Sequence, residues 1–134
     1  MKTRFRFEKL EVWQEARKLN GSISHLVRRF PRREMFALSS QIRRASVSVS
    51  SNIAEGAGRN SDRDFAHFLE LAYGSLMEVA SLLHLALDEG YICEPELDAL
   101  LNDVERLAKR IVSLNRSLAV QTSKTAFPPR GPDS

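Results

Sequence analysis

Six arginines, arranged as three adjacent pairs in the first half of the chain, are the side chains best suited to bind a charged ligand. The pairs are Arg28 and Arg29, Arg32 and Arg33, and Arg43 and Arg44. The planar guanidinium group forms forked hydrogen bonds with phosphates, so a cluster on one surface would bind nucleic acid with strong salt dependence and little sequence preference. The same residues would also suit a solvated face or an ion-pair surface between subunits, and their types alone leave these alternatives open.

The charge of the chain is unevenly distributed. Residues 1–63 hold 14 Lys and Arg against 6 Asp and Glu, a net charge of +8, whereas residues 64–134 hold 6 against 11, a net charge of −5. A basic half of this kind attracts a polyanion such as RNA or DNA, or the acidic half of a second copy of the chain. The charge therefore indicates two classes of partner without choosing between them.

Side chains for catalysis or metal binding do not form a recognisable set. A di-iron site in a helical bundle takes Glu-x-x-His motifs from two helices, and this chain offers a single Asp64-x-x-His67 pair. Cys93, the single cysteine, has no histidine nearby in sequence that would activate it. We therefore expect a protein that is not an enzyme, with no catalytic residues, no metal and no cofactor.

The composition and the N-terminal residues indicate a cytoplasmic protein. A single cysteine is compatible with a reducing compartment, because it forms no disulfide within the chain. The first residues lack the apolar segment of a secretory signal, and no apolar run approaches the length of a membrane span. We expect localisation in the cytoplasm and no association with a membrane.

Apolar residues recur every three or four positions in four segments, which predicts amphipathic helices over about residues 8–30, 35–56, 61–89 and 95–118. Alternating serine and valine over 46–50 would also suit a strand, but the helical phase continues on both sides. Four long helices with short connections predict an all-α, antiparallel up-down-up-down four-helix bundle over 8–120. A basic arm (1–7) precedes it, and the proline-containing tail (121–134) is expected to be disordered.

Several smaller features give these helices their expected ends and contacts. Pro31 ends the first helix, and Gly56 and Gly58 suit a left-handed residue at the end of the second. Ser61 is expected to cap the third helix, which is so apolar that it is either central in the domain or shared with another subunit. Small residues expected to allow close helix packing are Ser46, Ser50, Ser51, Ala54 and Gly74.

Two possible binding features have structural interpretations that we favour. Asn52 and Glu55 would serve as binding residues or, as we expect, would fix the end of a helix. Phe5 and Phe7 alternate with basic residues, and such an arm can hold a single strand by charge and stacking. We expect instead that one of these two rings anchors the arm to the bundle.

Glu78 lies on the most apolar of the predicted helices, where a carboxylate needs a partner. An antiparallel pairing of the second and third helices brings Arg44 level with this region. We therefore predict a structural ion pair between Glu78 and either Arg43 or Arg44. A helical net also places four residues on one outward strip, namely Arg33, Ala37, Ser40 and Arg44.

Five short motifs of this chain resemble those of a known family. They are Leu-Glu-Val-Trp at 10–13, Phe-Pro at 30–31, Leu-Ser-Ser-Gln-Ile-Arg-Arg-Ala at 38–45, Ser-Asn-Ile-Ala-Glu-Gly at 51–56 and Ala-Tyr-Gly-Ser-Leu-Met-Glu at 72–78. In this order they resemble the four-helix bundle proteins of the 23S rRNA intervening-sequence family. That family is similar to the accessory variability proteins of diversity-generating retroelements.

The resemblance implies a ring-shaped homopentamer of antiparallel bundles. For the retroelement branch it also implies a basic surface that binds nucleic acid and a reverse transcriptase. Together with the charge pattern, it leads us to expect a non-catalytic oligomeric bundle that binds RNA or DNA through the six arginines. The alternative is a protein-interaction scaffold or a reverse-transcriptase accessory protein, whose arginines contact subunits or partners.

Overall fold

A computed structural model describes residues 2–125 of the chain, with side chains for residues 2–120. Its elements in order are η1 (Arg6–Lys9), α1 (Glu11–Val27), η2 (Arg32–Glu34), α2 (Leu38–Ala57), α3 (Asp62–Asp88) and α4 (Glu94–Thr125). Over this range the structure is entirely helical, which confirms the predicted all-α class. The segment of alternating serine and valine lies inside α2, so the helical interpretation of residues 46–50 is correct.

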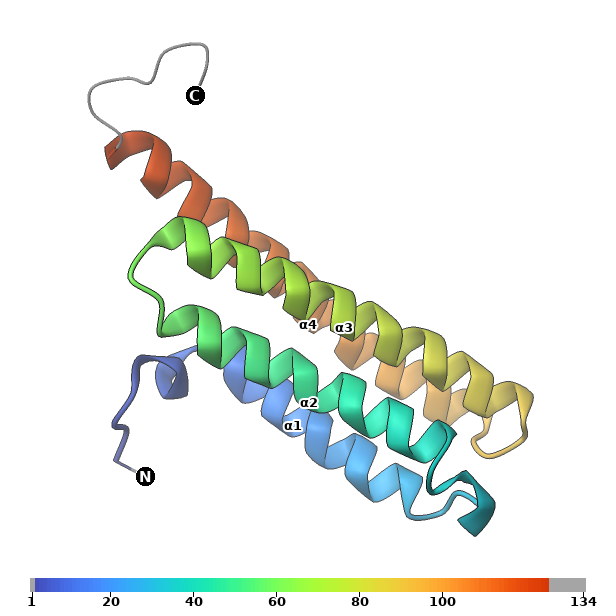
Figure 1. Cartoon of the computed structure of the whole chain (residues 1–134). Coiled ribbons are helices and arrows are strands. Elements are labelled where there is room, and N and C mark those ends of the chain that lie inside the picture. The colour runs from blue at the N-terminus through green and yellow to red at the C-terminus, as the bar shows by residue number, and fades with distance from the viewer. Residues whose placement is uncertain (1, 126–134) are drawn as a thin grey trace.

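Consecutive helices run antiparallel and pack side by side, as the up-down-up-down prediction requires (Figure 1). The α1–α2 and α3–α4 connections lie at one end of the bundle, and the α2–α3 turn lies at the other (Figure 1). All four helices contribute buried apolar side chains to one core, which includes Ile23, Ile42, Leu76 and Ile111. The predicted 3-4 spacing therefore marks the face that each helix turns toward the core.

The helices begin and end where local chemistry favours it. The Ser61 hydroxyl accepts a hydrogen bond from the Asp64 backbone N–H at 3.1 Å, which confirms the predicted cap of α3. α1 ends at Val27, earlier than predicted, in a turn that leads to Pro31. α2 begins only at Leu38, so Arg33 lies in η2 rather than on the predicted outward strip of α2.

Gly56 is required for close packing of α2 on α3, not for a left-handed turn. Gly58, the residue that follows α2, has φ of −87°, so the left-handed residue predicted here is wrong. A Cβ added at Gly56 would lie 2.7 Å from Phe68 Cβ and 2.9 Å from Phe65 Cδ1. Gly74 was expected to serve the same purpose, but a Cβ added there has no neighbour within 4 Å among the described residues.

Serine and asparagine side chains join the helices through short hydrogen bonds. Ser46 is 1% exposed and donates to Asn20 Oδ1 at 3.1 Å, across the α1–α2 interface. Ser48 and Ser75 join α2 to α3 through a 2.8 Å bond between their hydroxyls. Asn52 donates to the Ser48 backbone carbonyl at 2.9 Å, which confirms its structural interpretation.

The N-terminal arm lies against the bundle. Phe7 packs edge-on against Trp13 with 4.8 Å between ring centroids, as expected of an anchoring residue, whereas Phe5 is largely exposed. At the other end, α4 extends to Thr125, so residues 121–125 are helical rather than disordered. Residues 126–134 of the predicted tail lie outside the described part of the chain.

Candidate nucleic-acid interface

The predicted arginine cluster lies at the corner between α1 and α2. Phe30 is buried and packs against Tyr91 in the α3–α4 connection, with 5.2 Å between ring centroids. Pro31 then directs the chain into η2, where the backbone N–H groups of Glu34 and Met35 bond to the carbonyls of Pro31 and Arg32. This corner places Arg32 of η2 beside the arginines near the start of α2.

Four of the six predicted arginines line one surface groove of about 590 Å³. Arg28 follows the end of α1, Arg32 lies in η2, and Arg43 and Arg44 belong to the second turn of α2. The rest of the lining consists of Val27, Phe30, Pro31, Met35, Phe36, Ser39 and Ser40. The structure thus brings together charges that come from three separate elements.

The arginines of this groove have no acidic partner in the described part of the chain. Among residues 2–120, no Asp or Glu oxygen lies within 4.0 Å of a guanidinium nitrogen of Arg28, Arg32, Arg43 or Arg44. All four residues are exposed. Their charges are therefore not neutralised locally, and the groove presents a concentrated positive potential to solvent.

Arg29 differs from the groove arginines because it has a carboxylate partner. It donates to Glu96 Oε2 at 2.5 Å, and so joins the end of α1 to the start of α4. Glu96 Oε1 accepts a bond from the Cys93 backbone N–H at 3.0 Å. That bond, with the nearby Arg29 charge, lowers the pKa of Glu96 below its usual value of 4.5. Arg29 thus holds two helices together and does not line the groove.

Arg33 also points away from the groove. Its guanidinium donates to the Tyr91 hydroxyl at 3.4 Å, and that hydroxyl donates to Glu34 Oε2 at 2.7 Å. The bond to Glu34 is the main reason that the pKa of Tyr91 rises above its usual value of 10.0, and partial burial adds to it. The six predicted residues therefore divide into four that share the groove and two that contact the α3–α4 corner.

The predicted ion pair of Glu78 is not formed. Within the described chain, neither Arg43 nor Arg44 lies within 4.0 Å of the Glu78 carboxylate. Glu78 is exposed, so water solvates its charge and removes the reason for a protein partner. The prediction inferred from the apolar composition of this helix that Glu78 needs a partner, and the structure leaves this position exposed.

Sequence reasoning missed the apolar residues of the groove. Met35 is the first residue of the predicted helix over 35–56 and fits its 3-4 spacing, but it follows η2, lies outside α2 and is 49% exposed. Phe36 is 91% exposed, the largest value among the exposed apolar residues of the described chain. Its position off the apolar stripe was the signal that could have identified it.

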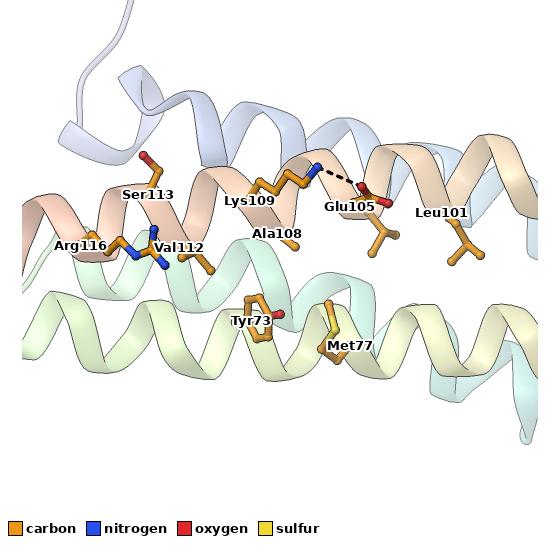
Figure 2. Close-up of a pocket in the computed structure, with 10 residues that line it drawn as sticks. Tyr73, Met77, Leu101, Glu105, Ala108, Lys109, Val112, Ser113 and Arg116 are labelled. Atoms are coloured by element: carbon orange, nitrogen blue, oxygen red, sulfur yellow. Dashed lines mark ion pairs between the residues drawn. The ribbon is translucent and has the colours of Figure 1, made fainter.

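A second groove, of about 700 Å³, lies between α3 and α4 (Figure 2). Tyr73 and Met77 point from α3 toward Ala108 and Val112 of α4, and Lys109 pairs with Glu105 at its rim (Figure 2). A smaller hollow of about 280 Å³ continues it toward Asn115. Tyr73 and Met77 lie off the 3-4 stripe of this helix, and that position was the signal that could have identified them.

Several large apolar side chains of α3 are exposed to solvent. Leu71, Tyr73, Met77 and Leu85 are each 37–48% exposed. Only 33% of the most apolar 18-residue window of this helix is buried. Of the helices in residues 2–125, α3 alone is long and apolar enough to cross a membrane by length and composition, a property it shares with core helices of soluble bundles.

Comparison with known proteins identifies the chain at the level of its family. The model of the 23S rRNA-intervening sequence protein family matches residues 8–113, which include α1, α2, α3 and the larger part of α4. The chain belongs to this family. The resemblance read from the five sequence motifs is thereby confirmed. No curated protein matches the chain.

A solved structure supports the same fold for this member of the 23S rRNA-intervening sequence protein family. It is the 1.70 Å crystal structure of a protein of unknown function from the S23 ribosomal protein family of Bacteroides thetaiotaomicron VPI-5482. The chains are 24% identical and superpose with a TM-score of 0.73, covering 78% of this chain and 95% of the other. The likeness establishes the four-helix fold.

Proposed function

We propose that this protein is a non-catalytic, oligomeric four-helix bundle of the cytoplasm that binds RNA or DNA through its arginine groove. The observation that carries the proposal is a set of four arginines around one open groove, namely Arg28, Arg32, Arg43 and Arg44, none of which pairs with a carboxylate of residues 2–120. Such a cluster repels itself, and a polyanion removes that repulsion. Arginine also suits phosphate because its fork of N–H donors matches the phosphate oxygens.

Salt dependence provides the first test of this proposal. Each phosphate contact contributes about −0.9 to the slope of log K against log salt on B-DNA and about −0.7 on single strands. Four groove arginines on four phosphates therefore predict a slope near −3. We would titrate structured RNA and duplex DNA at two salt concentrations by fluorescence anisotropy. Undetectable binding even at low salt would contradict the proposal.

A paired set of variants separates the groove from its surroundings. Arg32→Ala with Arg43→Ala removes two groove charges, whereas Arg29→Ala with Arg33→Ala removes two charges that already contact Glu96 and Tyr91. A bond to a charged group contributes about 1.5–3 kcal/mol, and 1.4 kcal/mol is a factor of ten, so the first pair should weaken binding by about 100-fold or more. The matched pair should weaken binding far less, although both remove the same charge.

The exposed apolar side chains of α3 support the oligomeric part of the proposal. Contact with a second copy of the chain would cover Leu71, Met77 and Leu85, whose exposure otherwise leaves apolar surface in water. The family resemblance favours a ring-shaped homopentamer. Sedimentation equilibrium tests the assembly, and Met77→Glu should dissociate it by placing a charge in the contact. A wild-type protein that sediments as a single copy would contradict it.

The same apolar surface supports a second function, that of a protein-interaction scaffold. In that case the groove arginines would contact a neighbouring subunit or a partner protein, such as a reverse transcriptase. The two functions differ in the behaviour of the Arg32 and Arg43 variants. Dissociation of the oligomer by these two substitutions, without any nucleic-acid binding by the wild type, would favour the scaffold.

A further inference from the structure

We infer that the arginine groove takes an unpaired stretch of a single strand, with Phe36 as a stacking residue for a base. The inference rests on the proposed function and specifies the class of nucleic acid within it. It makes Phe36 a binding residue in its own right, distinct from the arginines that hold phosphates.

Phe36 is an apolar ring displayed in the middle of a cationic surface. It is 91% exposed, although burial of an aromatic ring is strongly favourable and rings this open are uncommon on a stable fold. It lines the same groove as Arg32 and Arg43. By contrast, Phe30 and Phe65 are only 7% and 1% exposed. The groove therefore displays an aromatic face at the place where phosphates would be bound.

An aromatic face beside phosphate-binding groups suits a single strand better than a duplex. A duplex keeps its bases stacked inside and offers a protein mainly phosphates, sugars and base edges. A single strand has free base faces, and proteins that bind such strands combine a positive groove with aromatic side chains on which bases stack. The ring at position 36 would remain in water beside a duplex backbone, whereas an unpaired base would cover it.

The size and lining of the groove agree with this ligand. A volume of about 590 Å³ lies within the range of sites that enclose a small organic group, such as a base with its sugar. Met35, which is 49% exposed, extends the apolar surface next to Phe36. Ser39 and Ser40 add hydroxyl groups that can donate to the ligand or accept from it. A base on the ring, with phosphates toward Arg32 and Arg43, would engage both kinds of lining.

The test compares one unstructured strand with one duplex. Oligouridine is the single-strand probe because its bases stack weakly on each other, and a hairpin duplex of equal phosphate number is the second probe. Phe36→Ala should weaken oligouridine binding by roughly 5- to 150-fold, the effect of losing one stacked base, and should leave duplex binding unchanged. The salt slope for oligouridine should stay the same, because no phosphate contact is lost.

Two further variants complete the experiment. Phe5→Ala is the matched control, since Phe5 is also an exposed ring, at 62%, and does not line the groove. This substitution should change neither the affinity for oligouridine nor the affinity for the duplex. Phe36→Trp keeps a stacking surface and should retain oligouridine binding, with the new indole fluorescence quenched by the bound strand, against the constant background of Trp13.

The outcomes separate this inference from the function on which it rests. If the wild type binds neither probe, both proposals fail. If the wild type binds both probes and substitution of Arg32 and Arg43 weakens that binding, the proposed function stands. In that case, equal effects of Phe36→Ala on strand and duplex, or no effect on either, would overturn the stacking role. Dissociation of the oligomer by Phe36→Ala would also overturn it, since the ring would then belong to a subunit contact.

Discussion

The two ends of the bundle both place arginine near phenylalanine, but the surroundings of these residues differ. At the end with the α2–α3 turn, Arg59 lies 4.6 Å from the centre of the Phe68 ring and pairs with Glu55 at 2.9 Å. Arg6 lies 5.0 Å from the centre of the buried Phe65 ring. At the other end, Phe36 is exposed and the groove arginines have no acidic partner in the described chain.

The difference shows that the partners of an arginine, rather than its presence, mark a candidate binding surface. Cation–π contacts within about 6 Å are favourable. The contacts of Arg6 and Arg59 therefore stabilise the N-terminal arm and the α2–α3 turn. At the groove end, Arg29 bonds to Glu96 and Arg33 bonds to Tyr91, and these contacts also join separate elements of the bundle. Of the six arginines predicted from the sequence, the four that share the groove have no carboxylate partner within the described residues.

The largest effect that would test this comparison is the removal of all four groove arginines. Replacing Arg28, Arg32, Arg43 and Arg44 by Ala should abolish measurable nucleic-acid binding and reduce the salt slope by about three, at about 0.7 for each contact with a single strand. Replacing Arg6 and Arg59 by Ala should leave binding intact and lower the melting temperature instead. Anisotropy titrations and thermal melts of both variants check this, and a reversed pattern would show that the binding surface lies at the other end.

The next effect concerns the packing that positions Arg59 over its ring. Gly56→Ala places a methyl group against Phe68 and Phe65, and overpacking of this kind costs about 1–3 kcal/mol. The melting temperature should fall by roughly 4 °C for each kcal/mol in a chain of this size. Gly21→Ala is the control, because a Cβ there meets nothing within 4 Å and should stabilise α1 by about 0.5–1 kcal/mol. Equal melting temperatures for the two variants would show that α2 does not approach α3 closely at Gly56.

The fold could be predicted from the sequence because each helix carries its own signal. The 3-4 spacing of apolar residues reports the core face directly, and Pro31 and Ser61 mark helix boundaries through backbone chemistry that acts over a few residues. The start of α2 was placed too early because Met35 continues the apolar phase by coincidence, within a turn that only the packing of Phe30 on Tyr91 explains.

The division of the arginines could not be predicted, because it depends on contacts between distant parts of the chain. Arg29 meets Glu96 across 67 positions, and Arg33 meets Tyr91 across 58. Adjacent residues of identical type therefore acquire different roles from the way α1 and η2 meet the α3–α4 corner. The Glu78 pairing failed for a related reason, since the exposure of one side of α3 is a property of the whole bundle.

The smallest expected effect concerns the ion pair between Arg29 and Glu96, which lies beside the groove. The lowered pKa of Glu96 means that its ionised form stabilises the folded state. This contribution is fully present above the usual value of 4.5 and is lost as the pH falls through the lower folded value. Glu96→Gln keeps an acceptor for the Cys93 N–H but removes the charge, so it should lower the melting temperature at neutral pH. The difference from wild type should disappear in acid.

Glu78→Gln provides the matched control for this pH series. Glu78 is exposed and has no ion pair within the described chain, so the substitution should leave the melting temperature of a dilute sample unchanged. Neither substitution touches the groove, so nucleic-acid binding should persist in both variants at neutral pH. If Glu96→Gln weakened binding as strongly as loss of a groove arginine, then Arg29 released from its carboxylate, or the corner it holds, would belong to the binding surface. Arg29 would then count among the arginines that bind nucleic acid.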